Sequence, residues 1–256
     1  MNPLRVLLLV VVALLGGVLS AITGGTSLLT VPAMLLAGME PHVAVGTNML
    51  VVVALSAGSA GRFVTAGALP RRPTLMLSIT AVPGSVLGAL SAVALSEGTL
   101  RSVISVAMLS MAALLAFRPS LGQERASVSR RFSFGGSCLL ALWALYGGLF
   151  SGGYATVLTL GIVVFFGAPL TEAVGIAKVV NLTGSAAAAL VFVSFGKIDW
   201  VVGVSMGAGA ALGGWIGATV TLRAKPEFIR RLFATVVAAI GIKVGYDRLN
   251  HGYRGQ

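Results

Sequence analysis

The sequence is poor in charged residues and in cysteine. Charged side chains make up 10% of the 256 residues, only seven residues are acidic, and Cys138 is the single cysteine. One cysteine cannot form an internal disulfide, so we expect Cys138 to be a small core residue of an apolar helix. None of the acidic residues lies at the centre of an apolar segment. The sequence therefore shows no buried carboxylate on which a proton-coupled carrier would depend.

The sequence also lacks the motifs of common enzyme classes. It contains no HExxH motif, no cluster of cysteine and histidine, no paired carboxylates within an apolar segment, and no nucleophile spaced suitably from a base. These absences argue against an enzyme, and we expect neither a metal nor an organic cofactor. No basic run is interleaved with aromatic residues. A nucleic-acid partner is therefore not expected.

Apolar surface is what the sequence has in abundance. Hydrophobic residues make up 57% of the chain, and the mean hydropathy is +0.98. A soluble domain of this length could not bury so much apolar surface, so we expect an all-α protein that crosses the lipid bilayer several times. The formal net charge of +11 then fits loops that contact lipid head groups.

Part of the chain is repeated. Residues 44–107 recur without a gap as residues 173–236, so that matching residues differ by 129 in number, as Gly46 and Gly175 do. We expect a first membrane repeat over residues 1–117, a polar linker over 118–131, a second repeat over 132–249 and a tail over 250–256. Paired repeats in membrane proteins usually enclose a binding site where they meet.

Each repeat is expected to contain five apolar helices. In the first repeat they fall near residues 4–22, 27–37, 43–66, 74–96 and 100–117, and in the second near 134–150, 154–168, 172–195, 200–222 and 228–246. Five crossings, an odd number, would invert the second repeat, whereas four would leave the repeats parallel. The distribution of lysine and arginine does not choose between these topologies. The length of the apolar stretches favours five crossings and hence inverted repeats.

Two charge-free stretches are too long to be single membrane helices. Residues 6–39 and 132–171 carry no charge over 34 and 40 positions. Continuous helices of these lengths would reach about 50 and 60 Å, whereas the hydrocarbon core is about 30 Å thick. Glycines interrupt both stretches, in TGGTS at residues 23–27 and in SGGY at 151–154. We expect a helix, a break and a shorter helix in each, with the break lining a cavity.

Lys178 is a charged residue well inside an expected membrane helix. A lysine at this depth costs several kcal/mol unless it faces a cavity and meets an anion or a carbonyl group. The alternative is that it lies near the helix end and extends towards the head groups. Asn181 and Ser185 follow at helical spacing, which predicts a polar stripe on one face with Lys178.

The first repeat offers polar groups for the same cavity. The offset of 129 places Met49 opposite Lys178, next to Thr47 and Asn48, which are expected to approach the cavity from the other side. Thr26 and Ser27 are expected to cap the helix that begins near residue 27. An ammonium group, an amide, a hydroxyl and two helix N-termini would together favour a small oxyanion.

The chain resembles a known family. SAITGGTSLLTVPAMLLAGMEPHVAVGTNML resembles the first-repeat signature of the TauE/SafE family of sulfite and organosulfonate exporters, and GGLFSGG, EAVGIAKVVNLTGS and FGKIDW are similar to its second-repeat signature. The resemblance spans nearly the whole chain. It implies a multi-pass permease of the cell (inner, cytoplasmic) membrane that exports a small anion, sulfite or another sulfur oxyanion or sulfonate, by a secondary mechanism.

The family pattern also implies a site at Gly24 and Gly25, Thr47 and Asn48, and Lys178 and Asn181. Many members carry a longer glycine run where this chain has Thr26 and Ser27, and such side chains narrow the cavity or add hydroxyl donors. The anion is therefore left open. The full set of candidate substrate-binding residues is Gly24, Gly25, Thr26, Ser27, Thr47, Asn48, Ser151, Gly152, Lys178, Asn181 and Ser185.

The expected partners are a small inorganic or organosulfur anion and the lipid bilayer. The oligomeric state is open, with a homodimer as one option. A passive anion channel that uses the same cavity is an alternative function. An intramembrane enzyme or an assembly factor is a less favoured one.

Overall fold

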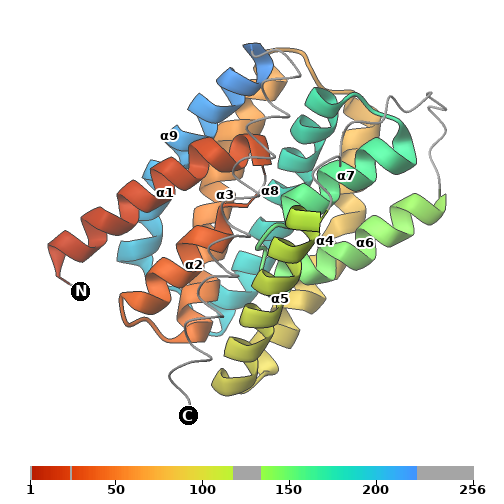
Figure 1. The fold of residues 1–256 in the computed structure, drawn as a ribbon. Coiled ribbons are helices and arrows are strands. Elements are labelled where there is room, and N and C mark those ends of the chain that lie inside the picture. Colours follow the sequence, from red (N-terminus) through yellow and green to blue (C-terminus); the bar gives the residue numbers. More distant parts are fainter. Residues whose placement is uncertain (1, 24, 118–133, 224–256) are drawn as a thin grey trace.

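The computed structural model describes residues 2–23, 25–117 and 134–223, which form a bundle of α-helices (Figure 1). These residues contain nine helices and no strand, as the composition predicts: α1 (Pro3–Thr23), α2 (Ser27–Leu36), α3 (Pro41–Thr65), α4 (Arg71–Ala94), α5 (Glu97–Phe117), α6 (Phe134–Leu149), α7 (Tyr154–Phe166), α8 (Leu170–Ser194) and α9 (Trp200–Arg223). The helix expected near residues 228–246 lies outside the described residues. Each of the other helices lies close to its predicted range.

Five of the described helices are long and apolar enough to cross a membrane, namely α1, α3, α4, α8 and α9. The outer faces of the bundle are apolar as well, with Leu190, Val201 and Leu142 exposed over 72%, 70% and 67% of their surface. Such faces suit contact with lipid.

Cys138 is also exposed, so its predicted place in the core was wrong. In a lipid environment an apolar face of α6 need not be buried.

Two long helices, α3 and α8, lie antiparallel in the middle of the bundle (Figure 1). Gly175, near the start of α8, packs on Phe63 near the end of α3, whereas Gly46, near the start of α3, packs on Phe192 near the end of α8. Both helices have 25 residues, and α4 and α9 both have 24. The bounds of α3 and α8, like those of α4 and α9, differ by 129.

Two other pairs of helices pack closely at glycine residues. Helix α1 packs on α9, and α6 packs on α4. A Cβ atom added to Gly213 of α9 would collide with the backbone of Leu14, and one added to Gly88 of α4 would collide with the backbone of Leu145. These contacts require a small residue, as is common where helices pack within membranes.

Both predicted breaks lie where the helices end. Helix α1 ends at Thr23 and α2 begins at Ser27, whereas α6 ends at Leu149 and α7 begins at Tyr154. In the second break Ser151 and Gly153 have φ angles of 65° and 78°. A left-handed conformation is unfavourable for serine and easy for glycine.

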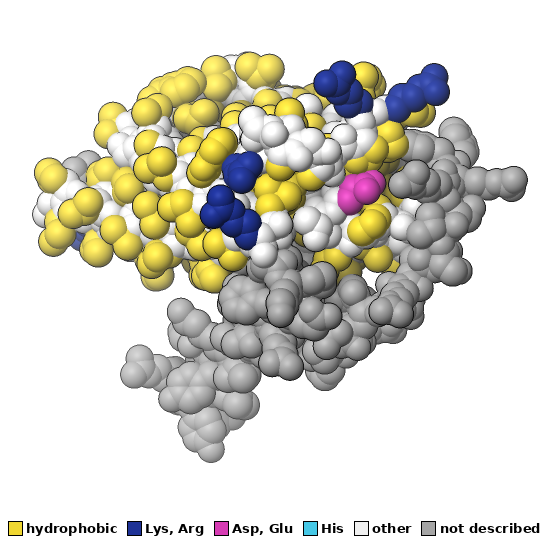
Figure 2. All heavy atoms as spheres, turned by 90° about the horizontal axis from the view of Figure 1, so that it is seen from above, with side chains coloured by type: hydrophobic (Ala, Val, Ile, Leu, Met, Phe, Trp, Pro, Cys, Tyr) yellow, Lys and Arg dark blue, Asp and Glu magenta, His cyan; other side chains and the backbone are white. Residues whose placement is uncertain are grey.

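The two ends of the bundle differ in charge. Figure 2 looks at the end where α3 and α9 end and α4 begins, and shows several basic side chains beside a single acidic one in a surface that is otherwise uncharged. We call this the basic end; its arginines are Arg62, Arg71, Arg72 and Arg223. The opposite end contains the loop before α3 with Glu40 and the loop before α9 with Lys197.

Candidate functional site

Lys178 reaches from α8 to the end of α1. Its Nζ atom donates to the backbone oxygen of Ser20 at 2.5 Å and lies 3.5 Å from the Ser20 hydroxyl. Lys178 is only 1% exposed and lies eight residues after Leu170, the first residue of α8, or about 12 Å along the helix axis. The side chain is enclosed by protein and directed to α1, which does not fit the alternative in which it extends to the head groups.

The Ser20 carbonyl belongs to the last turn of α1, where carbonyl groups lack a partner within the helix and the helix dipole is negative. An ammonium group is well placed there. Lysine has three N–H donors, and the two contacts with Ser20 use two of them. Among the described residues, Lys178 forms no ion pair with a carboxylate. The site therefore holds a buried lysine without a carboxylate partner in the described part of the chain.

Asn48 of α3 holds the start of α2. Its Nδ2 donates to the Ser27 hydroxyl at 2.9 Å, and its Oδ1 accepts a hydrogen bond from the Thr30 hydroxyl at 2.6 Å. All three side chains are at most 2% exposed. Lys178 and Asn48 thus anchor the two sides of the first break, one at the end of α1 and the other at the start of α2.

Thr26 and Ser27 do not cap α2 as predicted. Thr26 occupies the N-cap position without a side-chain hydrogen bond to the helix, because its hydroxyl donates instead to the Gly16 backbone oxygen at 3.3 Å. The Ser27 hydroxyl is engaged by Asn48. Gly25 lies at the break with part of its surface accessible, whereas Gly24 is outside the described residues. Among the residues that the structure describes, no side chain therefore caps the N-terminus of α2.

Asn181 connects α8 with α3. Its Nδ2 donates to the hydroxyl of Ser56 at 3.3 Å, and its Oδ1 accepts from the hydroxyl of Ser185 at 3.2 Å. Ser56 and Ser185 are the residues that the offset of 129 pairs. One amide therefore bridges two matching serines, and all three side chains are buried.

Thr47 does not share the surroundings of Asn48. Its hydroxyl accepts a hydrogen bond from the backbone N–H of Asp199 at 2.9 Å, at the start of α9. Neighbouring residues of a helix point in directions about 100° apart, which explains why the two side chains diverge. The structure gives the two side chains different hydrogen-bond partners, and their approach to one cavity stays a prediction.

The second break is organised by aromatic residues. The Tyr146 hydroxyl donates to the Gly152 backbone oxygen, and the Phe150 ring packs under Gly152. Ser151 is buried in its left-handed conformation. Ser151 and Gly152 are thus held mainly through α6, in surroundings unlike the polar anchors of the first break.

Several residues of the site were not identified from the sequence: Ser20, Thr30, Ser56 and Tyr146. Ser56 had a signal, because it is the repeat partner of Ser185. Thr30 follows Ser27 by three residues and therefore shares its helix face. The Ser20 contact involves a backbone carbonyl, which no residue type specifies.

One cavity lies away from these anchors. It has a volume of about 540 Å³ at the basic end and is lined by the loop between α3 and α4, the loop between α7 and α8, and Glu172. None of the predicted substrate-binding residues lines it.

A bundle with apolar outer faces, several helices able to span a membrane and buried polar anchors at a helix break defines a multi-pass membrane transporter. A model of the family described as "Sulfite exporter TauE/SafE" matches residues 9–244. The chain belongs to this family, and the predicted resemblance is confirmed.

Several curated proteins are similar over nearly their whole length. A "Probable membrane transporter protein ORF9" from a Sinorhizobium species is 29% identical over 240 residues, covering 93% of this chain and 92% of its own. A "Probable membrane transporter protein" from Haemophilus influenzae is 28% identical, with 90% of each chain covered. YfcA of Escherichia coli K12, also a "Probable membrane transporter protein", is 28% identical, with 98% of this chain and 93% of its own covered. No solved structure matches the chain significantly.

Proposed function

We propose that the protein is a secondary carrier of a small anion, sulfite or another sulfur oxyanion or sulfonate, and that it exports this anion across the cell (cytoplasmic) membrane. The family description supports this substrate class. The observation that carries the proposal is Lys178, which is 1% exposed at a helix break and forms no ion pair among the described residues. A buried cation of this kind normally meets an anion or a carbonyl group.

The anion is proposed to bind at the first break. There Lys178 has an N–H donor beyond those used by Ser20, and no side chain of the described ranges caps the start of α2. A helix N-terminus and an ammonium group both favour a small oxyanion. Asn48 contributes indirectly, because both ends of its amide are used to hold α2. We call Asn48 a positioning residue for this reason.

We further propose that the two halves are inverted repeats. The antiparallel contact of α3 with α8 and the offset of 129 between matching helices support this. So does the exchange of partners, in which α1 packs on α9 while α6 packs on α4. Inverted repeats place the binding site of a carrier near the middle of the membrane.

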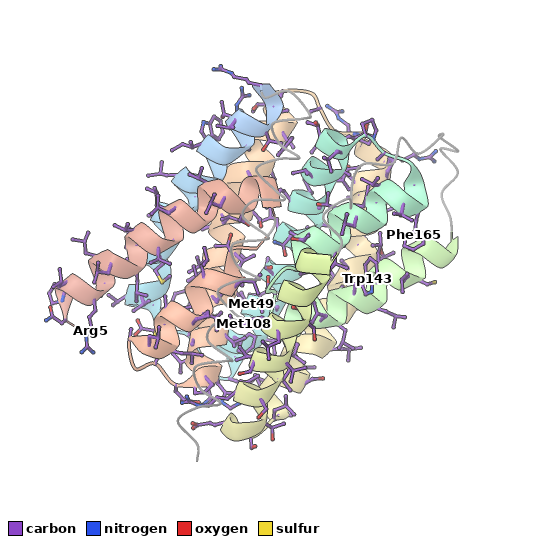
Figure 3. The ribbon with its side chains drawn as sticks, in the orientation of Figure 1. Arg5, Met49, Met108, Trp143 and Phe165 are labelled. Atoms are coloured by element: carbon purple, nitrogen blue, oxygen red, sulfur yellow. The ribbon has the colours of Figure 1, made fainter. Side chains whose placement is uncertain are left out.

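Counterflow in liposomes tests the proposal. Purified protein is reconstituted into vesicles loaded with unlabelled sulfite, and entry of external labelled sulfite is followed. A carrier shows entry that is stimulated by internal sulfite. In Lys178→Met the charge is removed while the length of the side chain is kept. The residue that the offset pairs with Lys178 is itself methionine, Met49, which Figure 3 labels. We expect this variant to lose at least nine-tenths of the stimulated entry.

The matched control is Arg101→Met, which removes a positive charge from an exposed position on α5. It should transport like the unchanged protein. Entry without stimulation by internal sulfite would indicate a passive channel instead of a carrier. Full stimulation in Lys178→Met would remove Lys178 from the mechanism.

A further inference from the structure

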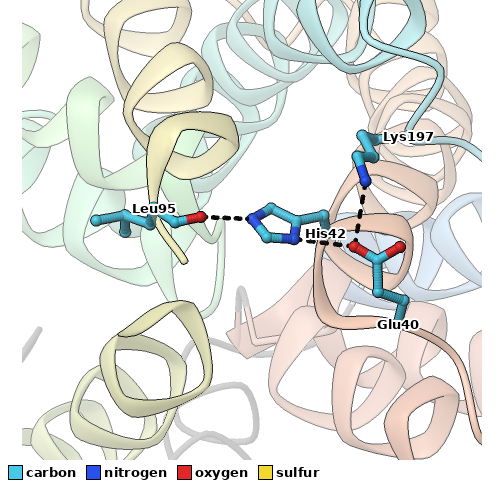
Figure 4. Close-up of polar contacts among 4 residues, drawn as sticks. All are labelled: Glu40, His42, Leu95 and Lys197. Carbon is cyan, nitrogen blue, oxygen red and sulfur yellow. Dashed lines mark hydrogen bonds and ion pairs between the residues drawn. The ribbon is translucent and has the colours of Figure 1, made fainter. Parts of the chain in front are cut away.

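An ion pair joins two loops at the end opposite the basic end (Figure 4). The Nζ atom of Lys197, in the loop between α8 and α9, lies 3.2 Å from Oε1 of Glu40, in the loop between α2 and α3. These loops belong to different halves of the chain. Partial burial raises the pKa of Glu40, but hydrogen bonds and charges from Lys197 and His42 lower it by more. The pKa of Glu40 therefore lies below its ordinary value, which keeps the carboxylate charged.

His42 links the connection between α4 and α5 to this ion pair. Its Nδ1 lies 3.0 Å from Glu40 Oε1, and its Nε2 lies 3.0 Å from the backbone oxygen of Leu95, just after α4 (Figure 4). A carbonyl oxygen only accepts, so Nε2 donates to the Leu95 oxygen. Three side chains, those of Glu40, His42 and Lys197, thus link the connections α2–α3, α4–α5 and α8–α9.

The basic end has no such pair at the matching positions. The offset of 129 pairs Lys197 with Ala68 and Glu40 with Pro169. Both Ala68 and Pro169 line the cavity of about 540 Å³. At matching positions, one end of the bundle therefore has the Glu40–Lys197 ion pair and the basic end has a cavity. The difference arises because Pro169 and Ala68 replace the two charged residues at the basic end.

We propose that Glu40 and Lys197, supported by His42, form a gate that closes one end of the carrier, while the cavity at the basic end is the entrance for the anion. This inference rests on the proposed carrier function. Glu172 is the charged residue that lines this cavity, but the four arginines of the basic end outnumber it and would attract anions towards the entrance. Opening of the Glu40–Lys197 contact would then release the anion at the opposite end.

The gate is weak enough to open in each transport cycle. The side chains of Lys197 and Glu40 are 34% and 35% exposed. Ion pairs this exposed change an equilibrium only about two- to fivefold. A stronger, fully buried pair would hold one conformation too firmly for a carrier that must alternate.

Cysteine labelling tests the gate in the purified full-length protein. Cys138→Ser first removes the native thiol, which is exposed. Met39→Cys then places a reporter next to Glu40 at a position that is 9% exposed. Ala168→Cys places one at the matching position, which lines the cavity. With a hydrophilic maleimide we expect the reporter at position 168 to react faster than the one at position 39.

Glu40→Gln should increase the labelling rate at position 39 about threefold, as loss of an exposed ion pair predicts, and should not increase the rate at position 168. Glu97→Gln is the matched control, because it removes a carboxylate from the start of α5, near His42's partner Leu95, without touching the pair. It should leave both rates unchanged. Exchange of the charges, Glu40→Lys with Lys197→Glu, should return position 39 to slow labelling.

Equal labelling of the two reporters in the unchanged protein would overturn the gate. So would an unchanged rate at position 39 in a Glu40→Gln protein that remains monodisperse. The assay contains no anion, so it does not depend on Lys178. If the Lys178→Met variant still transports sulfite, the proposed anion site is disproved. The labelling rates then still decide whether the Glu40–Lys197 pair forms a gate.

Discussion

Replacement of Asn48 by leucine tests whether α2 is held in place by α3. The side chain is fully buried, with its Nδ2 on Ser27 and its Oδ1 on Thr30. Leucine has a similar volume but no hydrogen-bonding group. The substitution therefore removes both hydrogen bonds of the Asn48 side chain to α2 without opening a large cavity.

The magnitude follows from the lost contacts. Hydrogen bonds between membrane helices stabilise by about 0.6 kcal/mol each on average, so two contribute roughly 1.2 kcal/mol. The buried Ser27 hydroxyl also loses its partner, which costs about 1 kcal/mol more. Thr30 keeps a hydrogen bond to the Thr26 backbone oxygen at 3.2 Å. A total near 2 kcal/mol corresponds to a fall in melting temperature of about 4–8 °C for a chain of this size.

The assay is thermal unfolding of purified protein in detergent, with and without sulfite. Asn48→Leu should melt at a lower temperature and lose most of the stabilisation by sulfite, because the N-terminus of α2 is no longer fixed. Ser91→Ala is the control, because the exposed Ser91 hydroxyl bonds only its own helix and should behave like the unchanged protein. An unchanged melting temperature with full stabilisation by sulfite in Asn48→Leu would refute the positioning role.

Three further changes test the fold and the gate. Gly88→Ala should lower the yield of monodisperse protein in size-exclusion chromatography. The reason is that the new Cβ atom would collide with the backbone of Leu145, and overpacking costs about 1–3 kcal/mol. Gly61→Ala is the control and should be tolerated, since the nearest neighbour of its new Cβ atom would be 4.0 Å away. Ser151→Gly should raise the melting temperature by about 2–4 °C, because Ser151 has a φ of 65° and left-handed serine costs roughly 1 kcal/mol; an unchanged or lower value would contradict this reasoning. The pKa of Glu40 is lowered on folding, so the stability it contributes should be present above its unfolded-state pKa and be lost as the pH falls through the folded-state value. Glu40→Gln should lack this acid-dependent loss in thermal unfolding, and an identical pH profile in both proteins would show that Glu40 is not responsible.

Much of the fold was predictable because lipid imposes simple rules. An uncharged stretch of about 20 residues fits a membrane helix, and glycines such as Gly25 and Gly152 mark where an overlong stretch must break. The offset of 129 predicted that α3 and α8 would have matching bounds. Cys138 was misplaced because the core rule of soluble proteins does not hold where the outer face contacts lipid.

The partners within the site were less predictable. Asn48 and Asn181 were selected as buried polar residues, but their partners depend on how helices cross, which one sequence does not reveal. Thr47 and Asn48 have different hydrogen-bond partners because neighbouring helical residues point in different directions. Lys178 pairs with the backbone of Ser20, and a backbone carbonyl leaves no trace in the sequence.

Calorimetric titration of the purified protein with sulfite tests the central claim most directly, by comparing the unchanged chain with Lys178→Met. Hydrogen bonds to charged groups contribute about 1.5–3 kcal/mol, so the account predicts saturable binding that weakens roughly ten- to hundredfold in the variant. Equal dissociation constants for two folded proteins would contradict it.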